Sequence, residues 1–291
     1  MRAVNVGNIT RRASLCVPGS EPARILKALR SGADEVVVDL EDAVAVGGKD
    51  AAREELARLE WPDERPRVAV RVNAPRTPWC HRDLVAVAGI PEVDSVVVPK
   101  VESQGDLAFV DRLLDGAEAG CGRQRRLAVQ ALLETAGGIA GVGEVVGASP
   151  RLVAVVIGYA DLAASLGRER PRDPGTWLAV QEQVLLHGRA AGVEVVDGPH
   201  LGVQDDDAFA TEVARSAALG FDGKWVIHPR QVARVASAFT PAADRVDHAR
   251  RVLAALQRAA EEGRGAAVLD DALVDEAMAR DARRVLARAA R

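Results

Sequence analysis

The 291-residue sequence contains no uninterrupted apolar run as long as a membrane-spanning helix, which needs about 20 such residues. Its first residues, MRAVNVGNITRR, also lack the long apolar segment of a secretory signal peptide. We therefore expect no membrane partner and no export. The sequence predicts a cytoplasmic protein.

Cysteine is scarce as well. Only Cys16, Cys80 and Cys121 occur, an odd number without the short spacings that hold a metal ion. Neither a disulfide framework nor a cysteine-based zinc site fits this count. We expect three reduced thiols, in agreement with a cytoplasmic location.

Long basic runs are also missing. Lysine and arginine number 38 against 42 aspartate and glutamate residues, which gives a formal net charge of −4. Proteins that bind nucleic acid or an anionic membrane surface usually carry clustered positive charge. We therefore expect neither nucleic acid nor a membrane as a partner.

The overall composition is that of a globular protein, with 48% hydrophobic and 27% charged residues. Short β-branched runs such as VVVDL, VAVRV and VAVVIG recur and are apolar on both faces. This pattern is typical of parallel strands covered by helices on both sides. The eight predicted strands are Ala13–Val17, Glu35–Leu40, Val68–Val72, Ser95–Val98, Leu127–Leu133, Leu152–Ile157, Val193–Val196 and Gly223–Ile227.

Apolar residues at helical spacing in Pro22–Ser31, Lys49–Leu59 and Asp106–Ala119 predict crossover helices between these strands. Eight strand–helix units within about 250 residues favour an α/β fold, a closed (β/α)8 TIM barrel. An open doubly wound sheet is the alternative, although GGIAGVG does not fit the glycine pattern of a dinucleotide-binding loop.

After Pro241 the sequence becomes rich in alanine and arginine. It shows two helical patterns, Asp244–Glu262 and Asp275–Ala290, joined by a glycine-containing link. We predict a catalytic barrel over residues 11–240 and a C-terminal helical extension over residues 241–291, rather than a second catalytic domain.

Charged residues follow the predicted strands, at the end where enzymes of this fold place their active sites. Glu134 directly ends the fifth strand, and Asp161 follows the sixth. Carboxylates from neighbouring strands would face each other and need a shared proton or a cation. Mg²⁺ takes one or two protein carboxylates together with water, whereas zinc is disfavoured because no His–Cys cluster accompanies them.

The ends of three further strands also carry charged residues. Glu41 and Asp42 follow the second strand, where they either hold metal-bound water or pair with Arg71. Arg71 ends the third strand, and its fork of donors suits a substrate carboxylate or acyl oxygen, a buried ion pair being the alternative. Lys100 follows Pro99 after the fourth strand, and the surrounding acids should raise its pKa, which opposes a Schiff-base role. We expect Pro99 and Lys100, like Arg71, in the substrate pocket.

Three rim residues have a second interpretation. Asp161 precedes LAASL and is a candidate helix cap as well as a metal ligand. His200 and His228 are candidates for acid–base groups, but a lone histidine near a strand end is more often structural.

At these residues the sequence resembles the HpcH/HpaI aldolase/citrate lyase family, in its citrate lyase β-subunit-like branch. The resemblance runs from residue 11 to about residue 290, and the combination of DLEDAV, PKVES and GKWVIHP is specific. The matching segments are RRASLCVPGS, VVVDLEDAV with KDAAR, VAVRVN with the TPW loop, VVVPKVES, ALLETAGGI, GYADLAASLG, VEVVDGPH, LGFDGKWVIHPRQV and AFTP.

The resemblance implies a Mg²⁺-dependent lyase that cleaves or forms carbon–carbon bonds of 3-hydroxyacyl thioesters. Citryl, malyl or citramalyl units on coenzyme A or an acyl carrier are the implied substrates. It further implies Glu134 and Asp161 as metal ligands, of which Glu134 also binds substrate. Glu41 and Asp42 are implied as their partners through water, and Arg71 as the anchor of the substrate carbonyl.

The family also places an acid in the C-terminal segment that reaches the site of a neighbouring subunit. In LDDALVDEA this acid is Asp275, and Asp271 stands where the family pattern has glycine. The resemblance therefore implies a homo-oligomer, a trimer or hexamer.

Other functions remain open at this point. One is a pyruvate-type class II aldolase acting on free 2-oxo-4-hydroxy acids, and another is malate synthase or thioesterase activity on the same scaffold. A third is a non-catalytic binding subunit. The DLEDAV motif and Asp275 favour the thioester lyase, and the full set of rim acids argues against a non-catalytic barrel.

Overall fold

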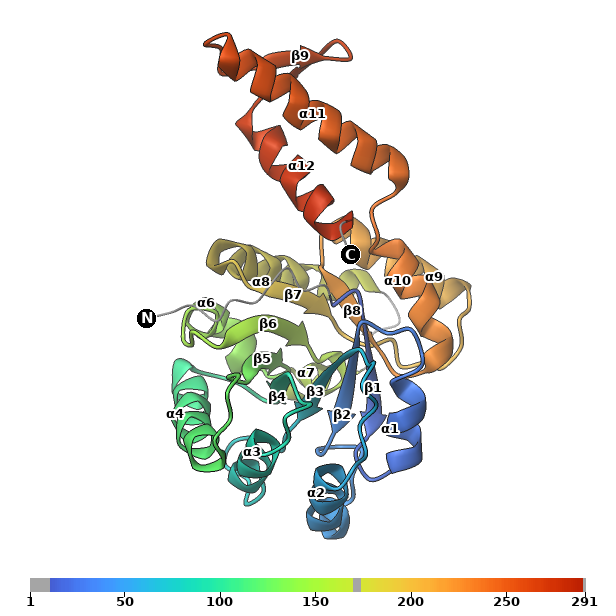
Figure 1. Cartoon of the computed structure of the whole chain (residues 1–291). Helices are drawn as coiled ribbons and strands as arrows, with labels where there is room; N and C mark the ends of the chain where they lie inside the picture. The colour runs from blue at the N-terminus through green and yellow to red at the C-terminus, as the bar shows by residue number, and fades with distance from the viewer. Residues whose placement is uncertain (1–10, 170–173, 290–291) are drawn as a thin grey trace. The chain divides into compact units, whose positions relative to one another are not determined.

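The structure is a computed structural model that describes residues 11–169 and 174–289. The chain divides into two compact units, one containing Arg11–Ala236 and the other Ser237–Arg291. Figure 1 shows the helices and strands of both units.

The first unit is a closed barrel of eight parallel strands that follow one another around the ring in chain order. The ring closes because β1 pairs with both β2 and β8. The predicted (β/α)8 barrel is confirmed, with each strand end within one residue of its predicted position, and the open sheet is wrong. The strands are β1 (Ala13–Pro18), β2 (Glu35–Asp39), β3 (Arg67–Arg71), β4 (Ser95–Val98), β5 (Ala128–Leu133), β6 (Leu152–Ile157), β7 (Glu194–Asp197) and β8 (Gly223–Val226).

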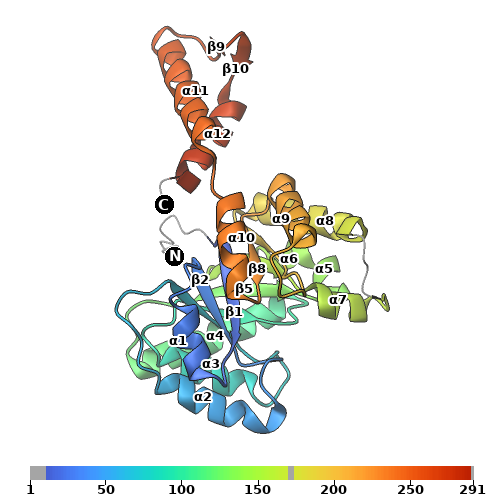
Figure 2. The ribbon, with the colours of Figure 1, turned by 90° about the vertical axis from the view of Figure 1, so that its right-hand side faces the viewer.

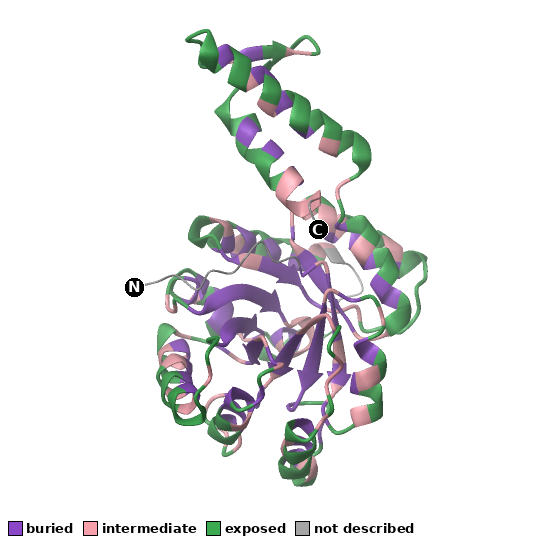
Figure 3. Ribbon diagram, viewed as in Figure 1, coloured by how far each residue is buried: buried purple, intermediate pink, exposed green. Residues whose placement is uncertain are grey.

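Helices surround the ring of strands (Figure 2), and the strands themselves are buried (Figure 3). The long α4 begins at a capping box of Ser103 and Asp106 and ends at Gly122, which has the left-handed conformation that stops a helix. The helices are α1 (Pro22–Ala28), α2 (Lys49–Ala57), α3 (Cys80–Ala88), α4 (Gln104–Cys121), α5 (Ala136–Ala140), α6 (Val142–Val145), α7 (Tyr159–Ser165), α8 (Leu178–Ala191), α9 (Asp207–Leu219) and α10 (Val232–Ala238), with 3-10 turns η1 (Val46–Gly48), η2 (Pro174–Trp177) and η3 (Pro229–Gln231).

The barrel interior is filled in layers, because alternate side chains of each strand point inward. On β2 these are Glu35, Val37 and Asp39. Glu35 lies in a polar layer near the strand starts, where it accepts a hydrogen bond from Gln130. Val37 belongs to an apolar middle layer. Asp39 pairs with Arg71 in a charged layer at the strand ends. This charged layer forms the mouth of the barrel.

The second unit packs α11 (Ala243–Glu261) against α12 (Glu276–Ala289). The predicted glycine-containing link between them is in fact a hairpin of β9 (Ala267–Leu269) and β10 (Ala272–Val274). Its turn residues Asp270 and Asp271 have φ values of 51° and 60°. Aspartate tolerates this left-handed region better than most residues do, so Asp271 serves where the family pattern has glycine. Among the helices described, none has the length and apolar character that a membrane crossing requires.

A candidate active site at the barrel mouth

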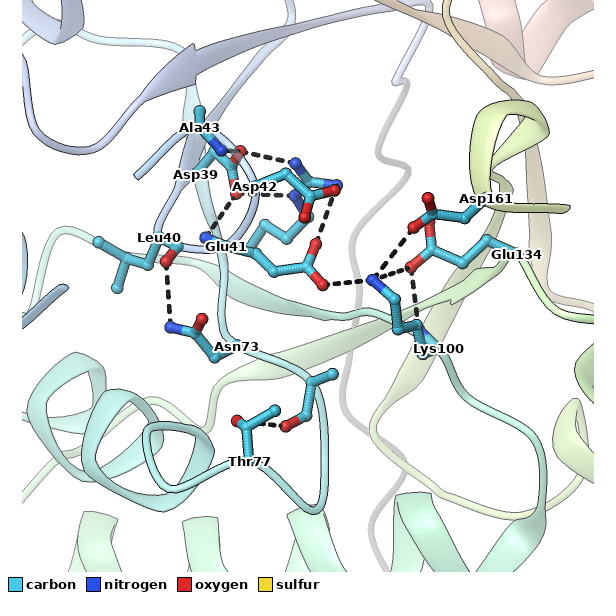
Figure 4. Close-up of polar contacts among 12 residues, drawn as sticks. Asp39, Leu40, Glu41, Asp42, Ala43, Asn73, Thr77, Lys100, Glu134 and Asp161 are labelled. Atoms are coloured by element: carbon cyan, nitrogen blue, oxygen red, sulfur yellow. Dashed lines mark hydrogen bonds and ion pairs between the residues drawn. The ribbon is translucent and has the colours of Figure 1, made fainter. Parts of the chain in front are cut away.

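Three carboxylates from different strands converge on one ammonium group at the barrel mouth (Figure 4). The Nζ atom of Lys100 lies 2.6 Å from Glu41 Oε1 and 3.1 Å from Asp161 Oδ2. Its distance to Glu134 Oε1 is 3.7 Å. The predicted site residues from β2, β4, β5 and β6 are therefore brought together, with a cation at their centre.

The backbone next to Glu134 and Asp161 is closely packed at Gly158. A Cβ atom at Gly158 would lie 2.5 Å from Glu134 Oε2 and 2.7 Å from Glu134 Cβ, so a larger residue there would displace Glu134. Gly158 is also the N-cap of α7, and it places Asp161 in the first turn of the helix. The interpretation of Asp161 as a helix cap is therefore wrong, because its side chain contacts Lys100 instead.

Lys100 holds its place through a constrained backbone. Its φ value is 54°, in the left-handed region that a lysine rarely adopts. Its backbone N–H donates to Glu134 Oε1 at 3.1 Å, while its side chain reaches Glu41. Pro99 is buried directly before it, just after β4, and neither Pro99 nor Lys100 is among the residues that line the mouth cavity. The left-handed backbone of Lys100 thus directs its own side chain across the barrel mouth toward Glu41.

Arg71 is anchored by Asp39 on the neighbouring strand. Its Nε and Nη2 atoms donate to the two oxygens of Asp39 at 2.7 and 2.6 Å. Nη1 lies 3.2 Å from Glu41 and 3.8 Å from Asp42. Asp39 also accepts hydrogen bonds from the backbone of Glu41 and Ala43. One buried carboxylate therefore fixes both the arginine and the loop that carries the two acids.

Burial and neighbouring charges shift the pKa values of Glu134, Glu41 and Lys100 in opposite directions. Burial raises the pKa of Glu134 to about 8, although the nearby Lys100 ammonium lowers it. Burial also raises the pKa of Glu41 against the effect of Arg71. For Lys100 burial favours the neutral amine, but the hydrogen bond to Glu41 and the charge of Glu134 outweigh it and raise its pKa. The amine stays protonated, as the sequence predicts, and a Schiff-base role is disfavoured.

The mouth has more acidic than basic groups. Five acidic side chains meet two basic ones there; the acids are Asp39, Glu41, Asp42, Glu134 and Asp161, and the basic residues are Arg71 and Lys100. Within the described residues no group of three potential ligands is already arranged around one metal position. Mg²⁺ needs only one or two carboxylates and keeps its waters. Glu134 and Asp161, which converge on the same ammonium, fit such an ion by chemistry and charge.

A cavity of about 170 Å³ opens beside four of these groups, Asp42, Arg71, Glu134 and Asp161. Its rim is charged and its inner end is apolar. The lining residues are Asp42, Arg71, Leu132, Glu134, Gly158, Tyr159, Ala160, Asp161, Pro199, Leu201 and Trp225. Leu132 and Trp225 belong to the apolar middle layer of the barrel and are 2% and 3% exposed. The sequence does not predict that Leu132 and Trp225 line the cavity, because apolar strand residues usually belong to the core. Only the structure shows that these two lie below the charged rim.

Asp275 lies in the second unit, directly before α12. Its carboxylate accepts hydrogen bonds from the backbone N–H groups of Ala277 and Met278. It is therefore the cap of this helix within its own chain. Its predicted role at the site of another subunit remains a prediction.

Other charged residues near the strand ends have structural partners. Asp197 is not among the residues that line the mouth cavity, and it pairs with the fully buried Lys224 at 2.7 Å. His200 contacts Glu212 at 2.7 Å, and His228 caps η3. The structural interpretation of both histidines fits these contacts. Lys224 could not be predicted here, because a lysine inside an apolar strand gives no sign of which face it occupies.

Comparison with known proteins agrees with this geometry. Residues 12–229 match the family described as HpcH/HpaI aldolase/citrate lyase. The chain is 38% identical to an L-malyl-CoA/β-methylmalyl-CoA lyase of Rhodobacter capsulatus, over 93% of this chain and 92% of that protein. It is 35% identical to the citrate lyase subunit beta of Escherichia coli K12, over 96% of this chain and 93% of that protein.

A solved structure extends the likeness to three dimensions. It is the CitE protein of Mycobacterium tuberculosis in complex with magnesium, acetoacetate and coenzyme A, which matches with a TM-score of 0.78 and 33% identity. The match covers 98% of this chain and all of that chain. The chain therefore belongs to the HpcH/HpaI aldolase/citrate lyase family.

Proposed function

We propose that this protein is a Mg²⁺-dependent carbon–carbon lyase that cleaves, or in reverse forms, a 3-hydroxyacyl-CoA thioester. The observation that carries the proposal is the convergence of Glu41, Glu134 and Asp161 on one cation beside Arg71. The similarity to proteins named malyl-CoA lyase and citrate lyase supports the thioester substrate.

When the bond between the α and β carbons of such a thioester breaks, the β-hydroxyl group gives its proton to a base and becomes the carbonyl of the oxo acid. The electron pair of the broken bond passes to the acyl-CoA, where it forms an enolate with negative charge on the thioester oxygen. Glu134 and Asp161 would hold Mg²⁺, which offsets charge on substrate oxygens when it is bound. Arg71 donates hydrogen bonds to the thioester carbonyl, where the charge develops. Asp39 takes two of its five N–H donors, and the remaining three are available to Glu41, Asp42 and the substrate.

Glu41 and Asp42 have two tasks in this proposal. They hold Arg71 in orientation through direct ion pairs, and they accept hydrogen bonds from water molecules around the metal ion. Lys100 neutralises Glu41 and approaches both proposed metal ligands, so it places positive charge beside the substrate acid. Buried Pro99 contributes to the pocket by fixing the end of β4 before Lys100.

The condensing direction also needs a base that removes a proton from the carbon next to the thioester. We assign this task to Asp275 of a neighbouring subunit, in a homotrimer or a hexamer. In support, the hairpin just before Asp275 exposes a cross-strand apolar pair, Val268 and Leu273, which are 70% and 69% exposed. Exposed apolar side chains next to a functional acid suit a contact with another subunit.

A cytoplasmic location completes the proposal. Cys16, Cys80 and Cys121 form no disulfide, which agrees with a reducing compartment.

The test is a substrate panel with and without Mg²⁺. The protein is incubated with malyl-CoA, citramalyl-CoA and citryl-CoA, and released oxo acid and acyl-CoA are separated by chromatography. We expect Mg²⁺-dependent release of an oxo acid together with acetyl-CoA. A free 2-oxo-4-hydroxy acid is the comparison substrate, since its cleavage in place of the thioesters would identify a class II aldolase. Release of free coenzyme A without an intact acyl-CoA would identify a thioesterase, and either result contradicts the lyase.

A further inference from the structure

The cavity at the barrel mouth ends on two core side chains, Leu132 of β5 and Trp225 of β8. Leu132 stands two residues before Glu134, which directly follows β5, so this apolar layer lies just below the charged one. Trp225 packs among aliphatic side chains such as Val37 and Val97. The indole and Leu132 together form the floor of the cavity.

The indole nitrogen of this floor lacks a partner. Nε1 of Trp225 is buried and makes no hydrogen bond within the residues that the structure describes. Buried donors are rarely left unpaired, because losing water without gaining an acceptor is costly. The cavity is the open space beside Trp225, so its occupant can supply the missing oxygen.

The size and charge of the cavity narrow the choice of occupant. Its volume of about 170 Å³ is small, since ligand pockets usually measure about 300–1,000 Å³. Among the lining residues, Arg71 at the rim carries the positive charge. The inner end offers apolar surface and a single neutral donor. A second carboxylate placed there would be buried without a counter-charge, which is strongly unfavourable.

Building on the proposed lyase function, we propose that Trp225 determines specificity for the oxo-acid half of the substrate. The acid that fits is a small 2-oxo monocarboxylate, such as glyoxylate or pyruvate. The indole N–H donates to an oxygen of this acid, and the ring fills the space that a longer acid needs. A dicarboxylate such as oxaloacetate, the oxo-acid half of a citryl unit, is rejected.

Three variants test the two tasks of Trp225 separately. Trp225→Phe keeps an aromatic floor but removes the N–H donor, and Trp225→Leu opens space. Trp61→Phe is the matched control, because Trp61 lies in the segment before β3, at the other end of the barrel. Each protein condenses acetyl-CoA with glyoxylate, pyruvate, 2-oxobutyrate or oxaloacetate in the presence of Mg²⁺, and kcat and KM are measured by chromatography of the acyl-CoA product.

We expect the wild-type protein to prefer glyoxylate or pyruvate over oxaloacetate by at least about tenfold in kcat/KM. Trp225→Phe should lower kcat/KM for the preferred acid about tenfold, mainly through KM, since one hydrogen bond to the substrate is lost. Its thermal midpoint should stay the same or rise, because the unpaired donor is gone. Trp225→Leu should shift the preference toward 2-oxobutyrate by about tenfold or more. Trp61→Phe should match the wild type.

Wild-type use of oxaloacetate as efficient as that of glyoxylate and pyruvate overturns the inference. Unchanged acid preferences and KM values in folded Trp225→Phe and Trp225→Leu do so as well. If Trp225→Leu does not fold, the KM and thermal midpoint of Trp225→Phe decide. Absence of turnover with every acid refutes the proposed lyase instead. The inference about Trp225 then depends on whether glyoxylate or pyruvate raises the thermal midpoint of the wild type but not of Trp225→Phe.

Discussion

The ammonium group of Lys100 lies 2.6 Å from Glu41 Oε1, across the mouth of the barrel from β4 to β2. The same ammonium also approaches Asp161 at 3.1 Å. A lysine thus supplies positive charge between acids that would otherwise repel one another. A divalent ion at Glu134 and Asp161 would add to this charge, so the lysine and the metal ion act on the same acidic cluster.

Loss of either proposed metal ligand should abolish Mg²⁺-dependent turnover. For Glu134→Gln and Asp161→Asn we expect kcat/KM to fall about a hundredfold or more, because a carboxylate ligand becomes a neutral amide. Mg²⁺ binding is measured by calorimetry, and folding by circular dichroism. Glu144→Gln makes the same chemical change at an exposed position of α6 and should behave like the wild type. Full activity in either ligand variant would refute the metal assignment.

Lys100→Met should make the protein more dependent on Mg²⁺ for stability. Without the metal ion, the mouth loses one of its two cations, and we expect the thermal midpoint to drop by about 2–4 °C, equivalent to about 1 kcal/mol. Added Mg²⁺ should then raise the midpoint more than it does in the wild type. Lys27→Met, on the exposed face of α1, serves as the control. An equal or smaller Mg²⁺ effect in Lys100→Met contradicts the shared acidic cluster.

Arg71→Lys should separate charge from geometry. Lysine keeps the positive charge but cannot donate to both oxygens of Asp39 while it also reaches the substrate. We expect kcat/KM to fall about a hundredfold or more, with little change in Mg²⁺ affinity. Asp39→Asn should cause part of the same loss, because Asp39 orients Arg71 without touching the substrate. If Arg71→Lys retains full activity, the fork geometry has no role in the reaction.

Asp275→Asn should stop turnover while Mg²⁺ still binds normally. Asparagine caps helices as well as aspartate does, so α12 should keep its first turn. The sharper test mixes Asp275→Asn subunits with Glu134→Gln subunits under conditions of subunit exchange. Each variant alone should be inactive, whereas mixed oligomers should recover activity at sites built from one chain of each kind. Continued inactivity after demonstrated exchange rules out a shared site.

The cysteines should differ in reactivity. Burial raises the pKa of Cys80 to about 12, so at pH 8 its thiol remains protonated, and only the thiolate reacts. Cys121 is exposed at the end of α4. Labelling with a disulfide reagent at pH 8 should therefore show one fast thiol, which Cys121→Ser removes, while Cys80 reacts only after denaturation. A fast phase that survives in Cys121→Ser contradicts this order.

The fold was accessible from the sequence because most of the barrel strands are short runs that are largely apolar on both faces. The C-terminal hairpin was not, since β9 and β10 have only three residues each. Its turn contains two aspartates in place of the glycine that usually marks a hairpin. The positive φ values of Asp270 and Asp271 appear only in the structure.

The site was accessible in part. Acids at strand ends indicate the mouth, so Glu134, Asp161 and Glu41 could be grouped from their positions alone. The inward or outward direction of a side chain is not encoded in a strand that is apolar on both faces. That is why Asp197 could not be distinguished from the mouth acids, and why Trp225 gave no sign that it forms the floor of a cavity.

The pairing of β1 with β8 has a consequence for synthesis on the ribosome. As the chain emerges, Glu41, Lys100, Glu134 and Asp161 all leave the exit tunnel before Trp225 does. The strand that closes the barrel, β8, is thus synthesised after all of these charged groups. Only when β8 pairs with β1 does the barrel close. Trp225 then completes the cavity below the acidic cluster, where we propose that a small acid binds.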